Sequence, residues 1–310
     1  MPQSFHIRTW SKSLPSRDHP QHNEDLIWSA RNGLAHAMID GMGGARRIVD
    51  GKPVGGEHAA AKIGEVLDVR LQDLPETLSV TAGRELLSVA VAEAGPKVFQ
   101  EVNASGQIPS SQVPAGKTAH EAMAAAVMTG LVFCEGGRRA VLGQNGDTRG
   151  YLFSGGELML LTEDQDAVAL DVHEGKLSED DALAVQEEMD AFDGHDIGKL
   201  SDRARYYFVR RYAAFGQIGD SAEPQAPVFS TIQLRPGDVI LLCSDGVYAN
   251  LTTAEIRDGL TAVDPAAALV DKADARSGER TLPDPNDLSA PYNYRAHVDD
   301  TSALVILVEW

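Results

Sequence analysis

Residues 26–44 read LIWSARNGLAHAMIDGMGG. Two apolar runs, 26–30 and 34–39, flank the turn-forming residues 31–33, and this arrangement predicts a β-hairpin. The second run stops at Asp40, and a glycine-rich stretch that we expect to be a loop follows it. The sequence therefore predicts a strand that ends on a carboxylate.

Predicted helices and strands continue along the rest of the chain. Alanine and aliphatic residues recur at helical spacing over 57–71 and 83–102, whereas the apolar run 121–133 fits a helix or a strand equally well. Short helices are expected after Thr252 or Thr253 and over 265–276. Short β-rich runs bounded by turn residues predict six further strands, at 138–145, 150–154, 157–162, 228–234, 239–246 and 301–310.

The composition changes between residues 166 and 220. Two amphipathic stretches, 178–192 and 202–215, are typical of helices and are separated by a polar loop. The first is acidic, and the second is basic and aromatic. We interpret this region as a helical subdomain inserted between strands.

The charge and the apolar content of the chain exclude several classes of protein. Of 310 residues, 43% are hydrophobic, and 27 basic against 46 acidic residues give a net charge of −19 at pH 7. Such a charge repels a phosphate backbone, so nucleic acid is not an expected partner. No apolar stretch reaches the roughly 18 residues of a membrane helix, and residues 1–10 lack the apolar centre of a signal peptide. We therefore expect a cytoplasmic protein that does not contact a membrane.

Seven acidic residues lie where predicted strands begin or end: Glu24, Asp25, Asp40, Asp147, Asp245, Asp299 and Asp300. Each alone is a common turn residue. If they converged beside apolar strands, however, the ionised carboxylates would repel one another unless cations held them. Oxygen ligands without histidine or cysteine at zinc spacing favour Mg²⁺ or Mn²⁺. Two such ions can activate a shared water and aim it at phosphorus, so the pattern indicates hydrolysis of a phosphate ester.

The order of these motifs resembles the metal-dependent protein phosphatases of the PPM (type 2C) family, above all the bacterial serine/threonine phosphatases. The resemblance rests on five segments: HNED at 22–25, AMIDGMGG at 37–44, NGDTRGYLFSGGELMLLTED at 145–164, LRPGDVILLCSDGV at 234–247 and VDDTSALVILV at 298–308. It implies an α+β fold, an α-β-β-α four-layer sandwich in which two antiparallel sheets pack face to face between helix pairs. It also implies one phosphatase domain over residues 1–310, with 166–220 as the flap that varies between relatives.

The resemblance implies a role for each acidic position. Asp40 would bridge two Mg²⁺ or Mn²⁺ ions, with the backbone carbonyl of Gly41 on one of them. Asp245 and Asp299 would complete the shell of the other ion. Asp40 and Asp245 are accordingly the expected catalytic residues.

Four further acidic positions have weaker expected roles. Glu24 and Asp25 would hold one ion directly or through water. Asp147, together with Asp245, matches the ligands of a third, weaker ion in bacterial relatives, although a turn aspartate is the alternative. Asp300 stands where relatives often have asparagine, so we expect it to orient its loop.

Two positions depart from the family pattern. Relatives usually carry an arginine shortly before the acidic pair, where it contacts the substrate phosphate, but here Arg17 lies further upstream. Either Arg17 or one of His19 and His22 takes this role, or the segment is a solvated leader without one. Met42 replaces a histidine that many eukaryotic relatives have and that bacterial members also lack.

The resemblance implies a phosphatase that hydrolyses phosphoserine and phosphothreonine in proteins through a water bridging two divalent metals. Its partners would be a phosphorylated protein and an opposing serine/threonine kinase. Two alternatives stay open: a two-metal hydrolase of another phosphate ester, and a non-catalytic module that binds phosphoproteins. The acidic residue at every expected ligand position argues against the second alternative.

Overall fold

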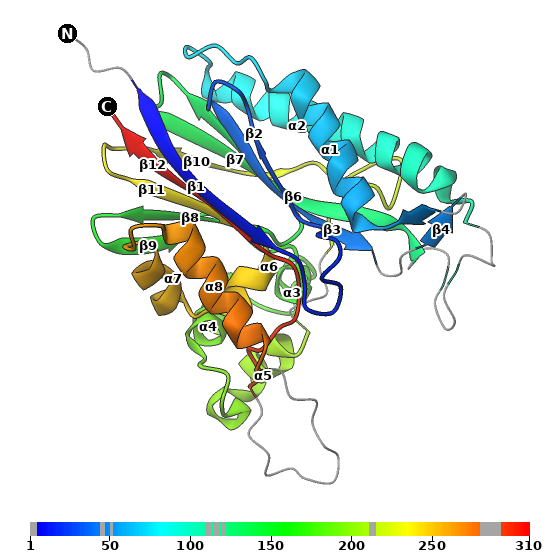
Figure 1. Ribbon diagram of the computed structural model, residues 1–310. Coiled ribbons are helices and arrows are strands. Elements are labelled where there is room, and N and C mark those ends of the chain that lie inside the picture. Colours follow the sequence, from blue (N-terminus) through cyan, green and yellow to red (C-terminus); the bar gives the residue numbers. More distant parts are fainter. Residues whose placement is uncertain are drawn as a thin grey trace.

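The computed structural model describes residues 5–43, 47–49, 52–108, 113, 118, 122–210, 215–279 and 293–310. Two five-stranded antiparallel sheets pack face to face, and helices cover the outer face of each sheet (Figure 1). The predicted α+β sandwich with four layers is therefore confirmed.

The first sheet contains the predicted hairpin. Its strand order is β10-β7-β6-β3-β2, and the helices α1 (Gly56–Arg70) and α2 (Val80–Lys97) pack on its outer face. A π-helical turn, Val98–Val102, continues α2, and a 3₁₀ turn, Ala104–Gly106, follows it. The strands are β2 (Leu26–Ser29), β3 (Ala35–Gly43), β6 (Ala124–Cys134), β7 (Arg139–Asn145) and β10 (Val228–Gln233).

The second sheet has the order β1-β12-β11-β8-β9. The helix α8 (Pro265–Ser277) packs on β1 and β12, and α7 (Thr253–Gly259), which Thr252 caps, lies against β9. The short helix α6 (Asp245–Tyr248) follows directly on β11. The strands are β1 (His6–Leu14), β8 (Arg149–Ser154), β9 (Glu157–Leu160), β11 (Val239–Cys243) and β12 (Thr301–Glu309), and a separate small sheet pairs β4 (Arg47–Val49) with β5 (Lys52–Val54).

The run that fitted a helix or a strand equally well forms β6. All eleven residues of β6 are buried, because it pairs with β3 and β7 while the second sheet covers one of its faces and α1 and α2 cover the other. A strand buried on both faces is apolar throughout and so lacks the alternation that would have identified it.

Strand β1 was not predicted from the sequence. All nine residues of β1 pair with β12 at the edge of the sheet. Only Ile7, Trp10 and Leu14 are apolar. Ile7 packs against the apolar cluster that includes residues of β3 and β6, and the other two pack against the cluster that includes residues of α7 and α8. The strand is held mainly by its backbone ladder, which leaves little trace in the sequence.

The predicted insertion contains α3 (Ala167–His173), α4 (Glu179–Ala191) and α5 (Asp202–Phe208). A 3₁₀ turn, Ile197–Lys199, lies between the last two. These helices share an apolar cluster of their own, in which the rings of Phe192 and Phe208 meet edge to face at 5.1 Å. In the view of Figure 1, α4 and α5 lie below α7. The expected helix 202–215 is shorter than predicted, since α5 ends at Phe208, and residues 211–214 lie outside the described part of the chain.

None of the helices in the described ranges combines the length and the apolar composition that crossing a bilayer requires.

Candidate metal centre

Asp40 and Gly41 lie on β3, where the start of α1 approaches the strand closely. A Cβ atom on Gly41 would lie 2.5 Å from the carbonyl oxygen of Glu24 and 2.5 Å from backbone atoms of Gly56. The N–H of Gly41 donates to the Glu24 carbonyl over 3.1 Å, and the N–H of Gly56 donates to the Glu24 carboxylate over 3.2 Å. Glycine is therefore required at 41, and the contact holds Glu24 beside the end of β3.

Asp245 is the first residue of α6, at the end of β11. The next residue, Gly246, packs against the segment before β12, where a Cβ atom would lie 2.0 Å from the carbonyl oxygen of Asp300. The fully buried Asn250 donates to the carbonyls of both Gly246 and His297 over 2.8 Å. These contacts bring the carboxylates of Asp245 and Asp299 to the same place, although they are 54 residues apart in the chain.

Asp300 and Asp25 connect the N-terminal segment to this region. Asp300 accepts the backbone N–H of Ser16 over 2.6 Å and that of Glu24 over 2.7 Å, so it orients these loops. Asp25 accepts the hydroxyl of Ser244, the residue before Asp245, over 2.8 Å. Both carboxylates thus hold the chain segments that present the other acidic residues.

The acidic side chains raise one another's pKa values. Burial, followed by the charges of Asp25 and Asp245, raises the pKa of Asp40 well above its usual range. Burial likewise raises the pKa of Asp25 and Asp147, and burial together with Glu57 raises the pKa of Glu24 to about 7. In the absence of cations, a cluster of this kind destabilises the folded chain at neutral pH.

Two carboxylate oxygens support a cation site directly. Among the described residues, Oδ1 of Asp25 and Oδ1 of Asp245 are buried and have no hydrogen-bond partner. A buried charged oxygen that accepts no hydrogen bond is costly unless a cation binds it. The donor set of carboxylates and a backbone carbonyl fits hard divalent ions such as Mg²⁺ and Mn²⁺.

His297 is a member of the cluster that the sequence analysis missed. Its Nε2 lies 3.2 Å from Oδ2 of Asp245 and 3.2 Å from Oδ2 of Asp299. Although burial lowers it, these two carboxylates raise the pKa of His297 to about 9. His297 lies two residues before the predicted ligand Asp299, but its contact with Asp245, 52 residues away in the chain, depends on the fold.

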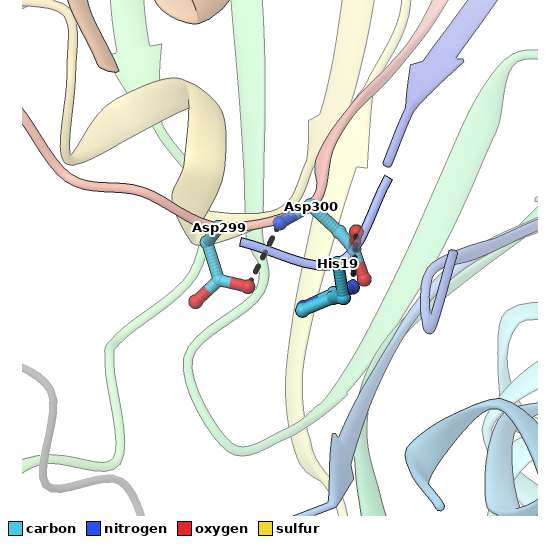
Figure 2. Close-up of side chains that lie close together, drawn as sticks. All are labelled: His19, Asp299 and Asp300. Carbon is cyan, nitrogen blue, oxygen red and sulfur yellow. Dashed lines mark hydrogen bonds and ion pairs between the residues drawn. The ribbon is translucent and has the colours of Figure 1, made fainter. Parts of the chain in front are cut away.

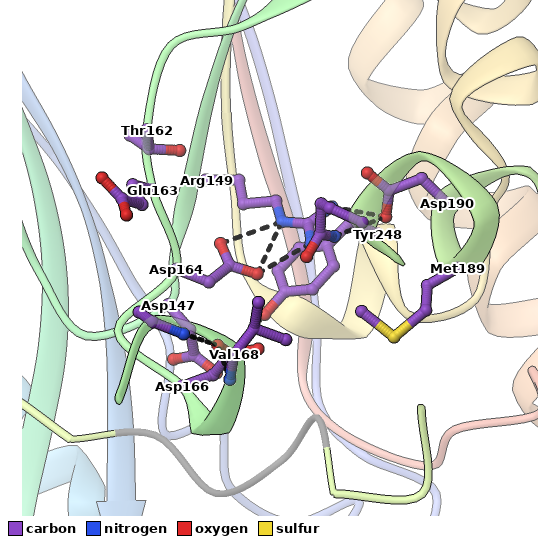
Figure 3. A network of polar contacts seen from close by, with 12 residues as sticks. Asp147, Arg149, Thr162, Glu163, Asp164, Asp166, Val168, Met189, Asp190 and Tyr248 are labelled. Carbon is purple, nitrogen blue, oxygen red and sulfur yellow. Dashed lines mark hydrogen bonds and ion pairs between the residues drawn. The ribbon is translucent and has the colours of Figure 1, made fainter. Parts of the chain in front are cut away.

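Asp147 lies where the cluster meets the helices of the insertion (Figure 3). The hydroxyl of Tyr248 donates to Asp147 over 3.3 Å, and the guanidinium of the buried Arg149 lies 4.0 Å over the Tyr248 ring. Arg149 makes salt bridges to Asp164 at 2.7 Å and to Asp190 of α4 at 3.1 Å. A polar network therefore connects Asp147 to the inserted helices.

The structure does not bring Arg17 into the cluster. Its guanidinium binds Asp274 of α8 at 2.6 Å and 2.9 Å. His19 lies closer to the acidic residues, with Nδ1 3.7 Å from Oδ1 of Asp300 (Figure 2), and its ring stacks on that of His22 at 4.4 Å. Of Arg17 and His19, it is His19 that lies beside the cluster.

Comparison with known proteins adds to this geometry. No family model and no curated protein matches the sequence. Among solved structures, the serine/threonine phosphatase PstP/Ppp of Mycobacterium tuberculosis has a TM-score of 0.65 at 20% identity, over 98% of this chain and 99% of that one. The catalytic domain of PstP in complex with two manganese ions gives 0.63 at 19% identity, over 99% and 100%. The PPM Ser-Thr phosphatase MsPP from Mycobacterium smegmatis gives 0.60 at 20% identity, over 98% and 99%. The chain therefore has the fold of the bacterial PPM serine/threonine phosphatases over almost its whole length.

Proposed function

We propose that this chain is a metal-dependent phosphatase that hydrolyses phosphoserine and phosphothreonine in proteins. The observation that supports this most strongly is the convergence of Asp25, Asp40, Asp245 and Asp299 at one end of the sandwich, with two buried carboxylate oxygens that accept no hydrogen bond. When bound, two Mg²⁺ or Mn²⁺ ions would lower the pKa of a shared water and orient it toward phosphorus.

The chain's own residues hold and shape this centre. Asp40 and the carbonyl of Gly41 would hold one ion. A second ion would be held by Asp40, Asp245 and Asp299. Asp147 and Asp245 would hold a third ion more weakly. Glu24 is positioned by Gly56, and Asp25 by Ser244. Their oxygens provide further ligands, either directly or through water.

The partners follow from this activity. A phosphorylated protein is the proposed substrate, and a serine/threonine kinase would supply it. The net charge of −19 argues against nucleic acid as a substrate. We also propose a cytoplasmic location for the chain.

Metal removal tests the proposal. With Mn²⁺ or Mg²⁺, we expect hydrolysis of a phosphothreonine peptide and of p-nitrophenyl phosphate, loss of both activities in EDTA, and recovery when Mn²⁺ is restored. Hydrolysis of the small ester alone would assign another phosphate ester as substrate. If Mn²⁺ binds but neither compound is hydrolysed, the chain would be a non-catalytic module that binds phosphoproteins.

The cation that contacts the substrate phosphate can be identified by two alanine variants. We expect His19→Ala to raise KM for the phosphopeptide about tenfold, since a charge-assisted hydrogen bond is worth roughly 1.5–3 kcal/mol. Arg17→Ala is the matched control and should leave KM within about twofold, because Asp274 holds its guanidinium. A KM that rises in Arg17→Ala and not in His19→Ala would reverse this assignment.

A further inference from the structure

His297 occupies a place in the cluster that an ordinary surface histidine would not have. Its side chain is 17% exposed, and the imidazole nitrogen lies between Asp245 and Asp299 at equal distances of 3.2 Å. The two aspartates belong to separate segments, the start of α6 and the approach to β12. The imidazole therefore touches both carboxylates that are expected to hold the same ion.

The backbone around His297 is held by buried polar groups. The side chain of Asn250 accepts the N–H of His297 over 3.0 Å and donates to its carbonyl over 2.8 Å. The buried Arg295, two residues earlier, donates to carbonyls at the ends of α4 and α6. These contacts fix the backbone position from which the His297 side chain extends toward the two aspartates.

The spacing of the three side-chain atoms suits a single ion. In an octahedral shell with ligands at about 2.1 Å, adjacent ligand atoms lie about 3 Å apart. The two contacts of 3.2 Å come close to this separation, and Oδ1 of Asp245 is buried without a hydrogen-bond partner among the described residues. One nitrogen and two carboxylates would then form one side of the shell.

We propose that Nε2 of His297 is a ligand of the ion held by Asp245 and Asp299, and that this nitrogen makes the site prefer a first-row transition ion to Mg²⁺. Imidazole binds transition ions well, whereas Mg²⁺ prefers oxygen ligands. The proposal deepens the proposed phosphatase and rests on its metal centre, but it does not depend on the substrate.

The test uses the full chain with Mn²⁺ as the probe and no substrate. Pulsed electron paramagnetic resonance, at sub-stoichiometric and at saturating Mn²⁺, should detect a directly bound imidazole nitrogen in the wild-type protein. The coupling should disappear in His297→Gln and persist in His19→Gln, a matched histidine that lies beside Asp300. Absence of nitrogen coupling in the wild type would overturn the proposal, and this outcome does not depend on whether the variants fold. Persistence of the coupling in His297→Gln would overturn it as well.

Calorimetry provides a second readout. We expect His297→Gln to weaken Mn²⁺ binding about tenfold or more, with a much smaller change for Mg²⁺. An equal loss for both ions would assign His297 a supporting role and would contradict the proposed ligation. A wild-type protein with nitrogen coupling but no phosphatase activity would refute the proposed function and leave this inference intact.

Discussion

Asp40→Asn should lower kcat for p-nitrophenyl phosphate by about 10²-fold or more at saturating Mn²⁺. A bound metal ion stabilises the transition state by several kcal/mol, and a loss of about 1.4 kcal/mol lowers the rate tenfold. Asparagine keeps the shape of the side chain and removes the charge that would bridge two ions. Asp271→Asn on α8, where the aspartate is 60% exposed and pairs with Lys12, is the matched control and should keep kcat within about twofold.

The same variant should stabilise the metal-free protein. Burial and the neighbouring carboxylates raise the pKa of Asp40, whereas in the unfolded chain an aspartate ionises near about pH 4. Folding therefore takes up a proton above that pH, and the stability of the metal-free wild type decreases as the pH rises. In EDTA, the gain in Tm of Asp40→Asn over wild type should be larger at pH 8 than at pH 5. A wild-type Tm equal to or above that of the variant at pH 8, or near wild-type turnover with Mn²⁺, would contradict the role given to Asp40.

Arg295→Ala should produce the largest loss of stability. Arg295 is 2% exposed, and its guanidinium donates to six carbonyls, those of Met189, Asp190, Phe192, Tyr248, Ala249 and Leu251. These carbonyls lie at, or shortly after, the C-terminal ends of α4 and α6, where a cation is favourable for the helix dipole. Because the variant leaves several buried carbonyls without donors, we expect the free energy of unfolding to decrease by roughly 3–5 kcal/mol.

Urea denaturation of the metal-free protein measures this loss. Arg8→Ala is the matched control, since the Arg8 side chain is 61% exposed and pairs with Glu309 at 3.4 Å, and it should cost less than about 1 kcal/mol. Arg295→Lys should lose much of the stability as well, because an ammonium group cannot reach both helix ends as a planar guanidinium does. If Arg295→Ala lost no more than Arg8→Ala, the inserted helices would not be tied to α6 through this residue.

The local elements were predictable because each depends on neighbouring residues. The turn at 31–33 between two β-rich runs predicted the hairpin that forms β2 and β3, and helical spacing over 57–71 predicted α1. Asp245 follows the end of β11 as predicted, whereas β3 continues past Asp40 to Gly43, where a glycine-rich loop was expected. By contrast, the state of β6 was ambiguous, because burial on both faces removes the alternation that distinguishes a strand.

The sequence by itself determined the hairpin, the strands from β7 to β12, the helices α1 and α2, and the acidic residues that lie beside strands. Only the tertiary structure decided that residues 6–14 form an edge strand, that Arg17 binds Asp274, and that His297 lies between Asp245 and Asp299. The reason is physical. A hairpin or a helix follows from interactions over a few residues, whereas pairing along a sheet edge and contacts between charged side chains depend on segments that only the packing of the two sheets and their helices brings together.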